Sequence, residues 1–571
     1  MYKELYKEWL ASEKLDKQDK QELLSLEGDE QEIEYRFGKE LEFGTAGMRG
    51  LLGVGLNMMN VYTVKRATQG LADYIKAEGE DAIKRGVAIS YDTRKNSELF
   101  AKASADVLAT NGIKVYLFND VHPVPMLSFA VRETNSIAGI MITASHNPKE
   151  YNGYKVYGED GAQMSPENTQ KVVDCINAIG SCLSDKILFG APVKGKIKII
   201  GKKIDKKYYK TIRKLTLSND IVKKVGKDIK LVYTPVHGSG YIPVTTILKK
   251  LGIKATLVEE QVNKDTEFST VEVPNPEYKE TLSYGIKLAD KIHADVVFGT
   301  DPDCDRLGVA IRNDKNEFVA LSGNQAGILM LDYVLLRLKE TGTLPENGFV
   351  VKSFVTTSMV KAIAEDYGVE LFETPVGFKF IGEKIKQYEV TGEKQYIFGF
   401  EESCGYLRGT HCRDKDAVVA SMLFAEMVCY YTYKKVSVYK RLCELYDKYG
   451  YCLDKSVSIN FSGLNAMSEM NAIVNKLKTQ PLEKIDIYNV VAIRDYSVPV
   501  RKLMDGTQEP IDIAPNNSVY YELENGSFVC VRPSGTEPKL KVYYSIKLKD
   551  FESASKAFDK MSKAFGELIK A

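Results

Sequence analysis

The chain has 571 residues, of which 44% are hydrophobic and 27% are charged. At roughly 100–200 residues per domain, this length predicts a globular protein of about three to five domains. Lys and Arg number 78, against 77 Asp and Glu. The formal net charge of +1 gives no reason to expect nucleic acid or an anionic membrane as a partner, so recognition of an anion has to be local.

Targeting segments and disulfides are not expected either. No apolar run approaches the length of about 18 residues that spans a bilayer, and the charged N-terminus is unlike a secretory signal. The nine cysteines are an odd number, scattered and without a Cys-x-x-Cys motif. This usage indicates a reduced, cytoplasmic protein. Zinc is not expected, because no cysteines or histidines fall at paired ligand spacing.

The first predicted elements give a charged helix followed by an α/β unit. Residues 1–26 have helical periodicity and many charges, and predict a solvated helix. After Gly44, strand-like runs alternate with helix-length amphipathic ones, which predicts α/β layering. The expected elements are strands at 87–91, 113–118 and 137–143 and a helix at 97–111 that Gly112 closes.

The same plan then repeats twice, and the last part of the chain differs. The second unit is expected to have strands at 230–234, 254–258 and 294–299 and a helix at 241–251 that Gly252 closes. The third is expected to have a strand at 348–354 between helices at 325–338 and 357–367. From Ser456 onward, Val-, Ile- and Tyr-rich runs precede a terminal helix at 551–569, which predicts a smaller α+β unit. The expected domains are 1–205, 206–323, 324–455 and 456–571.

A basic segment lies between the first two units. Residues 194–214 contain ten Lys or Arg among 21 residues. A solvated boundary segment is the favoured interpretation, and a binding patch is the alternative.

The loop after the strand at 294–299 carries three carboxylates at alternate positions. It reads Gly-Thr-Asp301-Pro-Asp303-Cys-Asp305-Arg306. On a sharply turning loop these carboxylates can converge on one hard cation, which would relieve their mutual repulsion. An EF-hand is excluded because Arg306 stands where the loop needs glycine. Mg²⁺ is the expected ion, because it keeps positions open for phosphate or water.

Two further loops suit an anion and a polyhydroxylated molecule. The stretch Arg532-Pro-Ser534-Gly535-Thr536 combines a bidentate guanidinium, hydroxyls and exposed backbone N–H groups, and predicts a phosphate site. Glu401, Glu402 and Ser403 follow an apolar strand and can accept hydrogen bonds from sugar hydroxyls; a capped helix start is the alternative. Nearby candidates for the same pocket are Thr374, Gly377, Lys379, His411, Arg413 and Lys415, with Asp416 as the expected N-cap of the helix at 417–430.

The stretch Thr143-Ala-Ser145-His146-Asn147-Pro follows a buried strand, a usual place for ligands in open α/β sheets. A Ser145–His146 hydrogen bond is not expected, because in an extended chain the two side chains point opposite ways, and the Gly-x-Ser-x-Gly elbow is absent. A cation site and an anion site together indicate a serine that carries a phosphoryl group. Lys155 is a candidate acid, base or charge stabiliser.

With these four loops in this order, the sequence resembles the α-D-phosphohexomutase family from about residue 40 to the C-terminus. The resemblance implies three similar mixed-sheet α/β domains and a C-terminal TATA-binding-protein-like domain around a central cleft. It implies Mg²⁺ bound by phospho-Ser145, Asp301, Asp303 and Asp305, with Lys155 in acid–base work. Arg306 adjoins the metal, and Arg49 and Arg94 align with arginines near the phosphoserine.

The implied reaction interconverts glucose 1-phosphate and glucose 6-phosphate through glucose 1,6-bisphosphate, which also serves as activator. Glu-Glu-Ser at 401–403 favours glucose over mannose within the family. A phosphopentomutase acting on ribose phosphates and a glucose 1,6-bisphosphate synthase stay open as alternatives. A catalytically silent scaffold and a metal-assisted hydrolase are further ones. The expected partner is a small phosphosugar, and the oligomeric state, monomer or dimer, is open.

Overall fold

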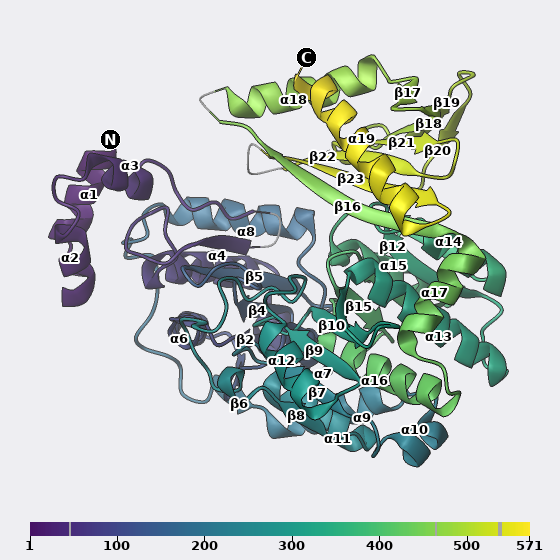
Figure 1. Ribbon diagram of the computed structural model, residues 1–571. Helices are drawn as coiled ribbons and strands as arrows, with labels where there is room; N and C mark the ends of the chain where they lie inside the picture. Colours follow the sequence, from purple (N-terminus) through teal and green to yellow (C-terminus); the bar gives the residue numbers. More distant parts are fainter. Residues whose placement is uncertain (45–46, 463–464, 535–538, 571) are drawn as a thin grey trace.

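The computed structural model describes residues 1–44, 47–462, 465–534 and 539–570, with side chains up to residue 567. Four β-sheets follow one another along the chain, and three of them form the lower body in Figure 1 while the fourth lies above. Within these residues, no helix combines the length and the apolar character needed to cross a bilayer. All nine cysteines are free thiols. The architecture is three α/β units followed by an α+β unit, as the sequence predicts.

The first sheet has the strand order β1-β5-β4-β2-β3-β6, with β5 antiparallel to both neighbours. Its central strands are apolar throughout because helices cover both faces. The strands are β1 (Gly47–Leu51), β2 (Val87–Tyr91), β3 (Val115–Phe118), β4 (Ala138–Ile142), β5 (Tyr151–Gly158) and β6 (Ile197–Ile200). The helices are α4 (Val61–Ala77), α5 (Glu80–Arg85), α6 (Ser97–Thr110), α7 (Val124–Thr134), α8 (Pro166–Ile179) and α9 (Lys202–Arg213).

The second and third sheets repeat a parallel centre with an antiparallel edge. Their orders are β11-β10-β9-β7-β8 and β13-β12-β14-β15. The second unit contains β7 (Leu231–Thr234), β8 (Ala255–Leu257), β9 (Val296–Thr300), β10 (Leu307–Arg312), β11 (Phe318–Leu321), α10 (Asn219–Val225), α11 (Tyr241–Leu251), a 3₁₀ turn (Glu259–Gln261) and α12 (Ser283–Ile292). The third contains β12 (Gly348–Ser353), β13 (Glu370–Thr374), β14 (Gln395–Glu401), β15 (Gly405–Arg408), α13 (Gly323–Glu340), α14 (Met359–Tyr367), α15 (Phe378–Thr391), α16 (Ala417–Tyr433) and α17 (Val438–Tyr449).

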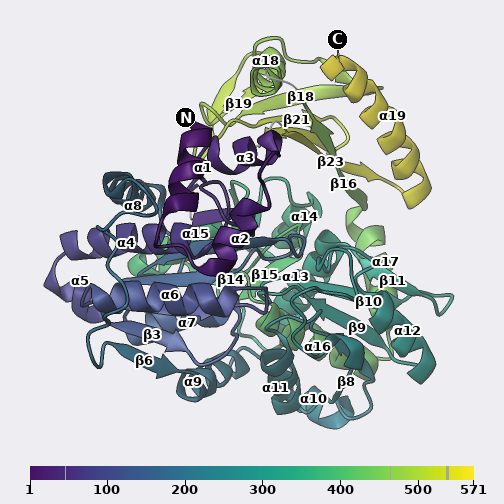
Figure 2. The same ribbon diagram turned by 90° about the vertical axis from the view of Figure 1, so that its left-hand side faces the viewer.

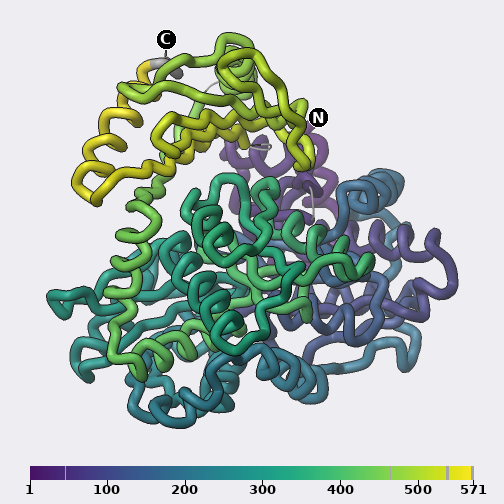
Figure 3. The backbone as a smooth tube through the Cα atoms, turned by 90° about the vertical axis from the view of Figure 1, so that its right-hand side faces the viewer, coloured from purple at the N-terminus to yellow at the C-terminus, as the bar shows by residue number. Residues whose placement is uncertain are grey.

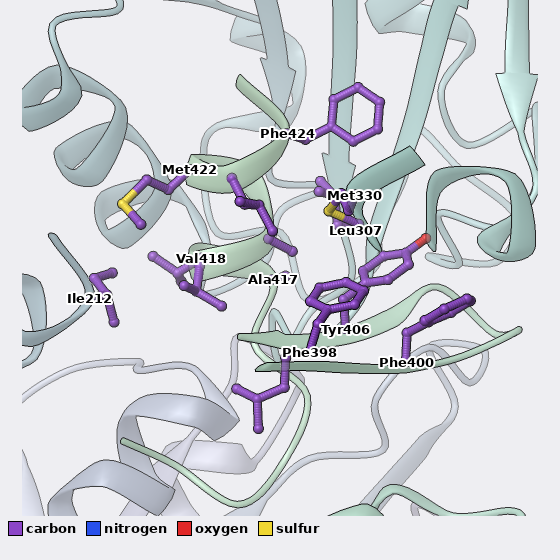
Figure 4. Close-up of a cluster of buried hydrophobic side chains, with 14 of the residues drawn as sticks. Ile212, Leu307, Met330, Phe398, Phe400, Tyr406, Ala417, Val418, Met422 and Phe424 are labelled. Atoms are coloured by element: carbon purple, nitrogen blue, oxygen red, sulfur yellow. The ribbon is translucent and has the colours of Figure 1, made fainter. Parts of the chain in front are cut away.

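Helix α16 joins these two units through one hydrophobic core. It is buried along almost its whole length, and Figure 4 shows side chains of this helix in one cluster with Leu307 of β10 and Phe398 of β14. The ring of Phe424 lies 5.7 Å from that of Phe298 on β9. Asp416 caps the helix by accepting hydrogen bonds from the N–H groups of Val418 and Val419, both at 2.9 Å, which confirms the predicted cap.

The fourth sheet is antiparallel and joins the third unit through its inner face. Helices α18 and α19 cover the outer face, while aromatic side chains of the inner face pack on Phe354 and Val355. The expected domain break at Ser456 falls inside β16, whose pairing with β23 already starts at Tyr451. The elements are β16 (Tyr451–Asn460), α18 (Ala466–Thr479), β17 (Lys484–Ile485), β18 (Tyr488–Asp495), β19 (Val500–Leu503), β20 (Gln508–Pro510), β21 (Val519–Leu523), β22 (Phe528–Pro533), β23 (Lys539–Leu548) and α19 (Phe551–Lys570).

The path of the chain between these two units is visible in Figure 3, where the tube rises from the lower body into the C-terminal unit. The ring of Phe354 stacks on Tyr496 at 4.3 Å, and Arg494 donates to Glu373 at 2.6 Å. Lys384 of α15 also pairs with Asp512 at 2.9 Å. The C-terminal unit is therefore attached to the third unit by a shared apolar cluster, two ion pairs and the continuous chain.

The expectation of a solvated N-terminal helix is wrong. Residues 1–40 form three short helices, α1 (Tyr2–Ala11), α2 (Lys17–Leu24) and α3 (Glu30–Phe37), beside the first unit in Figure 2. Trp9, the only tryptophan, is 1% exposed and meets Phe37 and Tyr62 edge to face. The apolar residues among the charges pack together and against the first unit, so this segment has a core of its own.

The packing of Trp9 makes a test of this segment possible. We expect Phe37→Ala to shift the fluorescence emission of Trp9 to the red in native buffer, because a buried Phe→Ala change costs about 3–5 kcal/mol and admits water beside the indole. Tyr35→Ala, an exposed aromatic change on the same helix, is the matched control and leaves the emission unchanged. Identical spectra for the two variants would contradict the packed arrangement.

Candidate active site

Loops from the three α/β units meet at the ends of their strands. Ser145 follows β4, Asp301 follows β9 and Glu401 ends β14. The Ser145 hydroxyl donates to Asp301 Oδ2 at 3.2 Å, which joins the first unit to the second. The Leu307 N–H donates to the carbonyl of Cys404 at 3.0 Å, which joins the second to the third. Residues that are far apart in the sequence thereby share one site.

The backbone of Ser145 is left-handed, with φ +53°. Because the chain turns here instead of staying extended, Ser145 Oγ lies 3.2 Å from His146 Nδ1. The sequence-based expectation that no such hydrogen bond forms is therefore wrong. Burial, together with the charges of Arg306 and Arg49, lowers the pKa of His146 to about 2, so its imidazole is neutral. His146 can exchange a hydrogen bond with the serine without adding charge to the site.

A buried arginine holds the Ser145 loop in shape. The Arg94 guanidinium donates to the carbonyls of Ser145 at 2.6 Å, Pro148 at 2.8 Å and Tyr151 at 3.1 Å, and also to that of Asn147. The side chain of Asn147 accepts a hydrogen bond from Arg49 at 3.0 Å. Arg94 thus acts on the backbone of the loop, whereas Arg49 contacts one of its side chains.

The three carboxylates of the acidic loop converge and are buried. Asp301, Asp303 and Asp305 are at most 2% exposed, and they offer oxygens that lie within 4.8 Å of one another. Burial and the charges of its two neighbours raise the pKa of Asp301 well above its ordinary value. Oδ1 of Asp303 and Oδ1 of Asp305 have no hydrogen-bond partner among the described residues. Unpartnered carboxylate oxygens in an all-oxygen donor set fit a hard divalent cation.

Two lysines neutralise part of this charge. Lys155 of β5 lies 2.9 Å from Asp303 Oδ2, and Lys415 lies 3.2 Å from Asp305 Oδ2. Burial favours the protonated form of Asp303, but Lys155, the hydrogen bond with Asp301 and the charge of Lys415 together lower its pKa. Lys415 also pairs with Asp414 at 3.0 Å. The structure therefore brings Lys155 and Lys415, two of the predicted residues, directly to the acidic loop.

The segment at 401–403 lies beside the turn at 374–379. Glu401 Oε1 accepts a hydrogen bond from the Gly377 N–H at 2.6 Å, and Glu402 accepts from Ser353 at 3.2 Å. Burial raises the pKa of Glu401 to about 7, with Lys415 opposing and Glu402 adding to the rise. Ser403 is partly exposed, Thr374 is buried, and Lys379, whose pKa burial lowers, lies 4.8 Å over the ring of Phe380.

His411 and Arg413 are directed away from the acidic loop. His411 Nε2 lies 2.7 Å from Asp416 Oδ2, and the Arg413 guanidinium is buried against Glu389 and the Thr410 carbonyl. His411, Cys412 and Asp416 form a second group that can hold a metal, which sequence spacing did not suggest. Asp416 caps α16 and contacts His411, and Cys412 donates to the Asp414 carbonyl, so most of these atoms have structural partners without an ion; only Nδ1 of His411 has none among the described residues.

Arg532 and Ser534 belong to the C-terminal unit. Arg532 lies on β22, where it interacts with Tyr543, and the Ser534 N–H donates to the Lys539 carbonyl at 2.8 Å. Burial raises the pKa of Tyr543, the charge of Glu402 adds to the rise, and Arg532 opposes it. The predicted residues Gly535 and Thr536 lie outside the described residues.

Sequence reasoning missed two residues that contact the predicted site. Glu277 forms an ion pair with Arg306, and Asp414 holds Lys415 and accepts from Tyr157 at 2.9 Å. Asp414 adjoins Lys415, so a search for charges beside the predicted residues would have found it. Glu277 lies in an irregular stretch before α12, where no local pattern marks it.

The raised pKa of Glu401 predicts a pH-dependent cost to folding. Between about pH 4.5 and 7, ionisation is favourable in the unfolded chain and unfavourable in the native one, so stability falls as pH rises through this window. We expect the free energy of unfolding of unliganded Glu401→Gln to exceed that of the parent protein by an amount that grows from pH 5 to pH 8, up to roughly 3 kcal/mol. Thermal unfolding at each pH measures it. The exposed Glu393→Gln is the control, and a gain independent of pH would contradict the assignment.

Comparison with known proteins bears on the whole chain. Four models of the phosphoglucomutase/phosphomannomutase family match in order: alpha/beta/alpha domain I at 40–181, domain II at 206–315, domain III at 322–449 and the C-terminal domain at 469–547. A phosphoglucomutase of Staphylococcus saprophyticus is 35% identical over 93% of this chain and 95% of its own length. One of Staphylococcus aureus MRSA252 is 36% identical over 93% and 94%.

Solved structures show the same fold. A putative phosphomannomutase of Thermus thermophilus superposes with a TM-score of 0.69 at 21% identity, covering 92% of this chain and 99% of its own. The open form of the Paramecium phosphoglucomutase parafusin gives 0.66 at 17% identity, covering 93% and 95%. From the four ordered matches and the length of the alignments, the chain belongs to the phosphoglucomutase/phosphomannomutase family.

Proposed function

We propose that this protein is a phosphoglucomutase that interconverts α-D-glucose 1-phosphate and glucose 6-phosphate through a phosphoserine at Ser145. The observation that carries the proposal is the contact of the Ser145 hydroxyl with Asp301 in a buried carboxylate cluster that can hold a cation. The glucose assignment is supported by the Staphylococcus relatives, which are named phosphoglucomutases. Glucose 1,6-bisphosphate is then the intermediate and the activator.

The acidic loop fits Mg²⁺, with Asp301, Asp303, Asp305 and the phosphoryl oxygens of phospho-Ser145 as its proposed ligands. When bound, the ion supplies Lewis-acid stabilisation of the charge on the transferring phosphoryl group. Arg306 adjoins these carboxylates and is held by Glu277. Arg94 fixes the loop that presents the serine, so the position of Oγ does not depend on a mobile turn.

Each half of the reaction exchanges one phosphorus–oxygen bond for another. A free sugar hydroxyl attacks phosphorus, the bond from phosphorus to Ser145 Oγ breaks, and the bisphosphate forms. The hydroxyl loses a proton and Ser145 Oγ gains one; Lys155, beside Asp303, is the group we propose for this movement. After the bisphosphate turns round, Ser145 Oγ attacks the other phosphorus and the bond from that phosphorus to the sugar oxygen breaks. Oγ loses its proton and the sugar oxygen gains one, so the phosphoserine is restored and the sugar monophosphate leaves.

Turning round requires loose contacts to the sugar and one fixed anchor for its distal phosphate. Glu401, Glu402 and Ser403 are proposed to accept or donate hydrogen bonds to sugar hydroxyls in either orientation, with Gly377 holding Glu401 in place. Arg532 and Ser534, together with Gly535 and Thr536, are proposed as the phosphate anchor, because their sequence suits a phosphate and because Arg532 and Glu402 both act on Tyr543. We propose only supporting roles for His411 and Arg413, whose side chains contact Asp416 and Glu389.

The phosphoserine can be tested directly. We expect Ser145→Ala to lower kcat by at least about 10³-fold, because the covalent acceptor is lost while the sugar contacts remain. After incubation with glucose 1,6-bisphosphate, the parent protein should gain the mass of one phosphoryl group and the variant none. Ser181→Ala, on an exposed loop of the same unit, is the control. Unchanged turnover in Ser145→Ala would refute the mechanism.

Substrate choice needs a separate measurement. On one sample, kcat/KM for glucose 1-phosphate should exceed that for ribose 1-phosphate, because the hydrogen-bonding groups at 401–403 are proposed to match a hexose. A higher value for ribose 1-phosphate would make the protein a phosphopentomutase. Stoichiometric consumption of an acyl phosphate would indicate a bisphosphate synthase, and net release of inorganic phosphate a hydrolase.

A further inference from the structure

The basic segment at 194–214 forms one wall of a cavity that shares no lining residue with the acidic loop. This cavity has a volume of about 560 Å³ and lies between β6, the first turns of α9 and the end of α7. It is called the lysine pocket below. Sites for small molecules commonly occupy 300–1,000 Å³. The size therefore suits a compact ligand rather than a flat protein surface.

A second cavity, of about 630 Å³, lies between α4 and α8 and has a different character. Its lining carries both signs of charge, from Arg66, Glu40 and Glu42, so these charges favour neither anionic nor cationic ligands. The basic segment does not line it. The lysine pocket alone carries the inference.

The lysine pocket is lined by charges of almost one sign. Lys198, Lys202, Lys203 and Lys207 face a single carboxylate, that of Glu133, which pairs with Lys207. Among the described residues, Lys198, Lys202 and Lys203 are in no ion pair, and Lys202 and Lys203 are exposed. Cations that line one cavity repel one another, and a ligand with more than one negative charge would relieve the repulsion.

The rest of the lining suits a small molecule. Ile199 is 59% exposed, and the Lys198 ammonium lies 6.0 Å from the ring centroid of Tyr116. Asn119 adds an amide at the same wall. An apolar floor, one amide and several cations match a compact body that carries phosphate groups.

We infer that the lysine pocket binds a small ligand with two or more phosphate groups, at a site separate from the cleft where Ser145 lies. The net charge of the chain is +1, so this binding would arise from local charge and not from a general affinity for anions. The inference does not depend on the proposed mutase reaction.

The inner face of α9 contacts the loops that support the acidic cluster. Asp205 Oδ1 lies 3.1 Å from His122 Nε2, and two residues further on the Val124 N–H donates to the Asp303 carbonyl at 3.0 Å. Tyr208 donates to Asp416 Oδ2 at 2.7 Å, beside Lys415. The lysine pocket thus lies on the outer face of α9. The inner face of this helix contacts His122 and Asp416, which lie close in the chain to Val124, the partner of Asp303, and to Lys415.

Isothermal titration with inorganic tripolyphosphate tests the site. The titration uses the full chain with Arg532→Ala, which removes the proposed phosphate anchor of the cleft, in metal-free buffer because tripolyphosphate chelates cations. We expect saturable binding that K202Q/K203Q weakens at least about tenfold, since two charge-assisted contacts are lost. K249Q/K250Q, which removes two adjacent exposed charges on α11, is the matched control and changes Kd less than about twofold.

Hydrogen exchange on the parent protein locates the ligand. Tripolyphosphate should slow exchange at 198–207, and this protection should disappear in K202Q/K203Q. Three results would overturn the inference: no saturable binding, equal weakening by both lysine pairs, or protection confined to the described residues around Arg532. Tighter binding of an acidic peptide than of tripolyphosphate, in competition, would reassign the lysine pocket to a protein partner.

Discussion

The site depends on the repulsion among three buried carboxylates. Asp301, Asp303 and Asp305 are withdrawn from water and lie within hydrogen-bonding range of few donors, so their negative charge is costly until cations balance it. Lys155 comes from the first unit and Lys415 from the third. The loop of the second unit is therefore stabilised by charges that only the assembled molecule supplies, which couples the arrangement of the α/β units to the integrity of the site.

Arg94 and α16 hold in place the loops and units around this cluster of carboxylates. Arg94 binds four carbonyls of the Ser145 loop, and α16 fills the core between the second and third units. The C-terminal unit packs on the third unit through a shared apolar cluster and two ion pairs. The phosphoryl transfer is thus proposed on loops of the three α/β units, and the phosphate anchor on the C-terminal unit.

Local patterns predicted much of this structure. The alternation of apolar strands and amphipathic helices predicted the α/β units, and the positions of Gly252 and Asp416 correctly marked a helix end and a helix start. The three alternating aspartates were found because their spacing itself is the signal. The N-terminal helices were misjudged, since a high density of charge hid the few apolar residues, among them Trp9, that pack together.

Contacts across units could not be predicted from the sequence. Glu277 and Arg306 are distant in the sequence and form an ion pair only because the fold brings them together. The orientations of His411 and Arg413 depend on their partners, Asp416 before α16 and Glu389 on α15. The hydrogen bond between Ser145 and His146 was missed for another reason. A periodicity argument assumes one regular backbone, and a single left-handed residue breaks that assumption.

The left-handed backbone at Ser145 also limits which amino acid can occupy the position. Threonine also carries a hydroxyl that can accept a phosphoryl group. Its branched Cβ, however, is strongly disfavoured at φ +53°. Serine is the smallest side chain that combines a nucleophilic oxygen with tolerance of this turn. The choice between two interchangeable alcohols is thus made by the geometry of the main chain, before any feature of the reaction is considered.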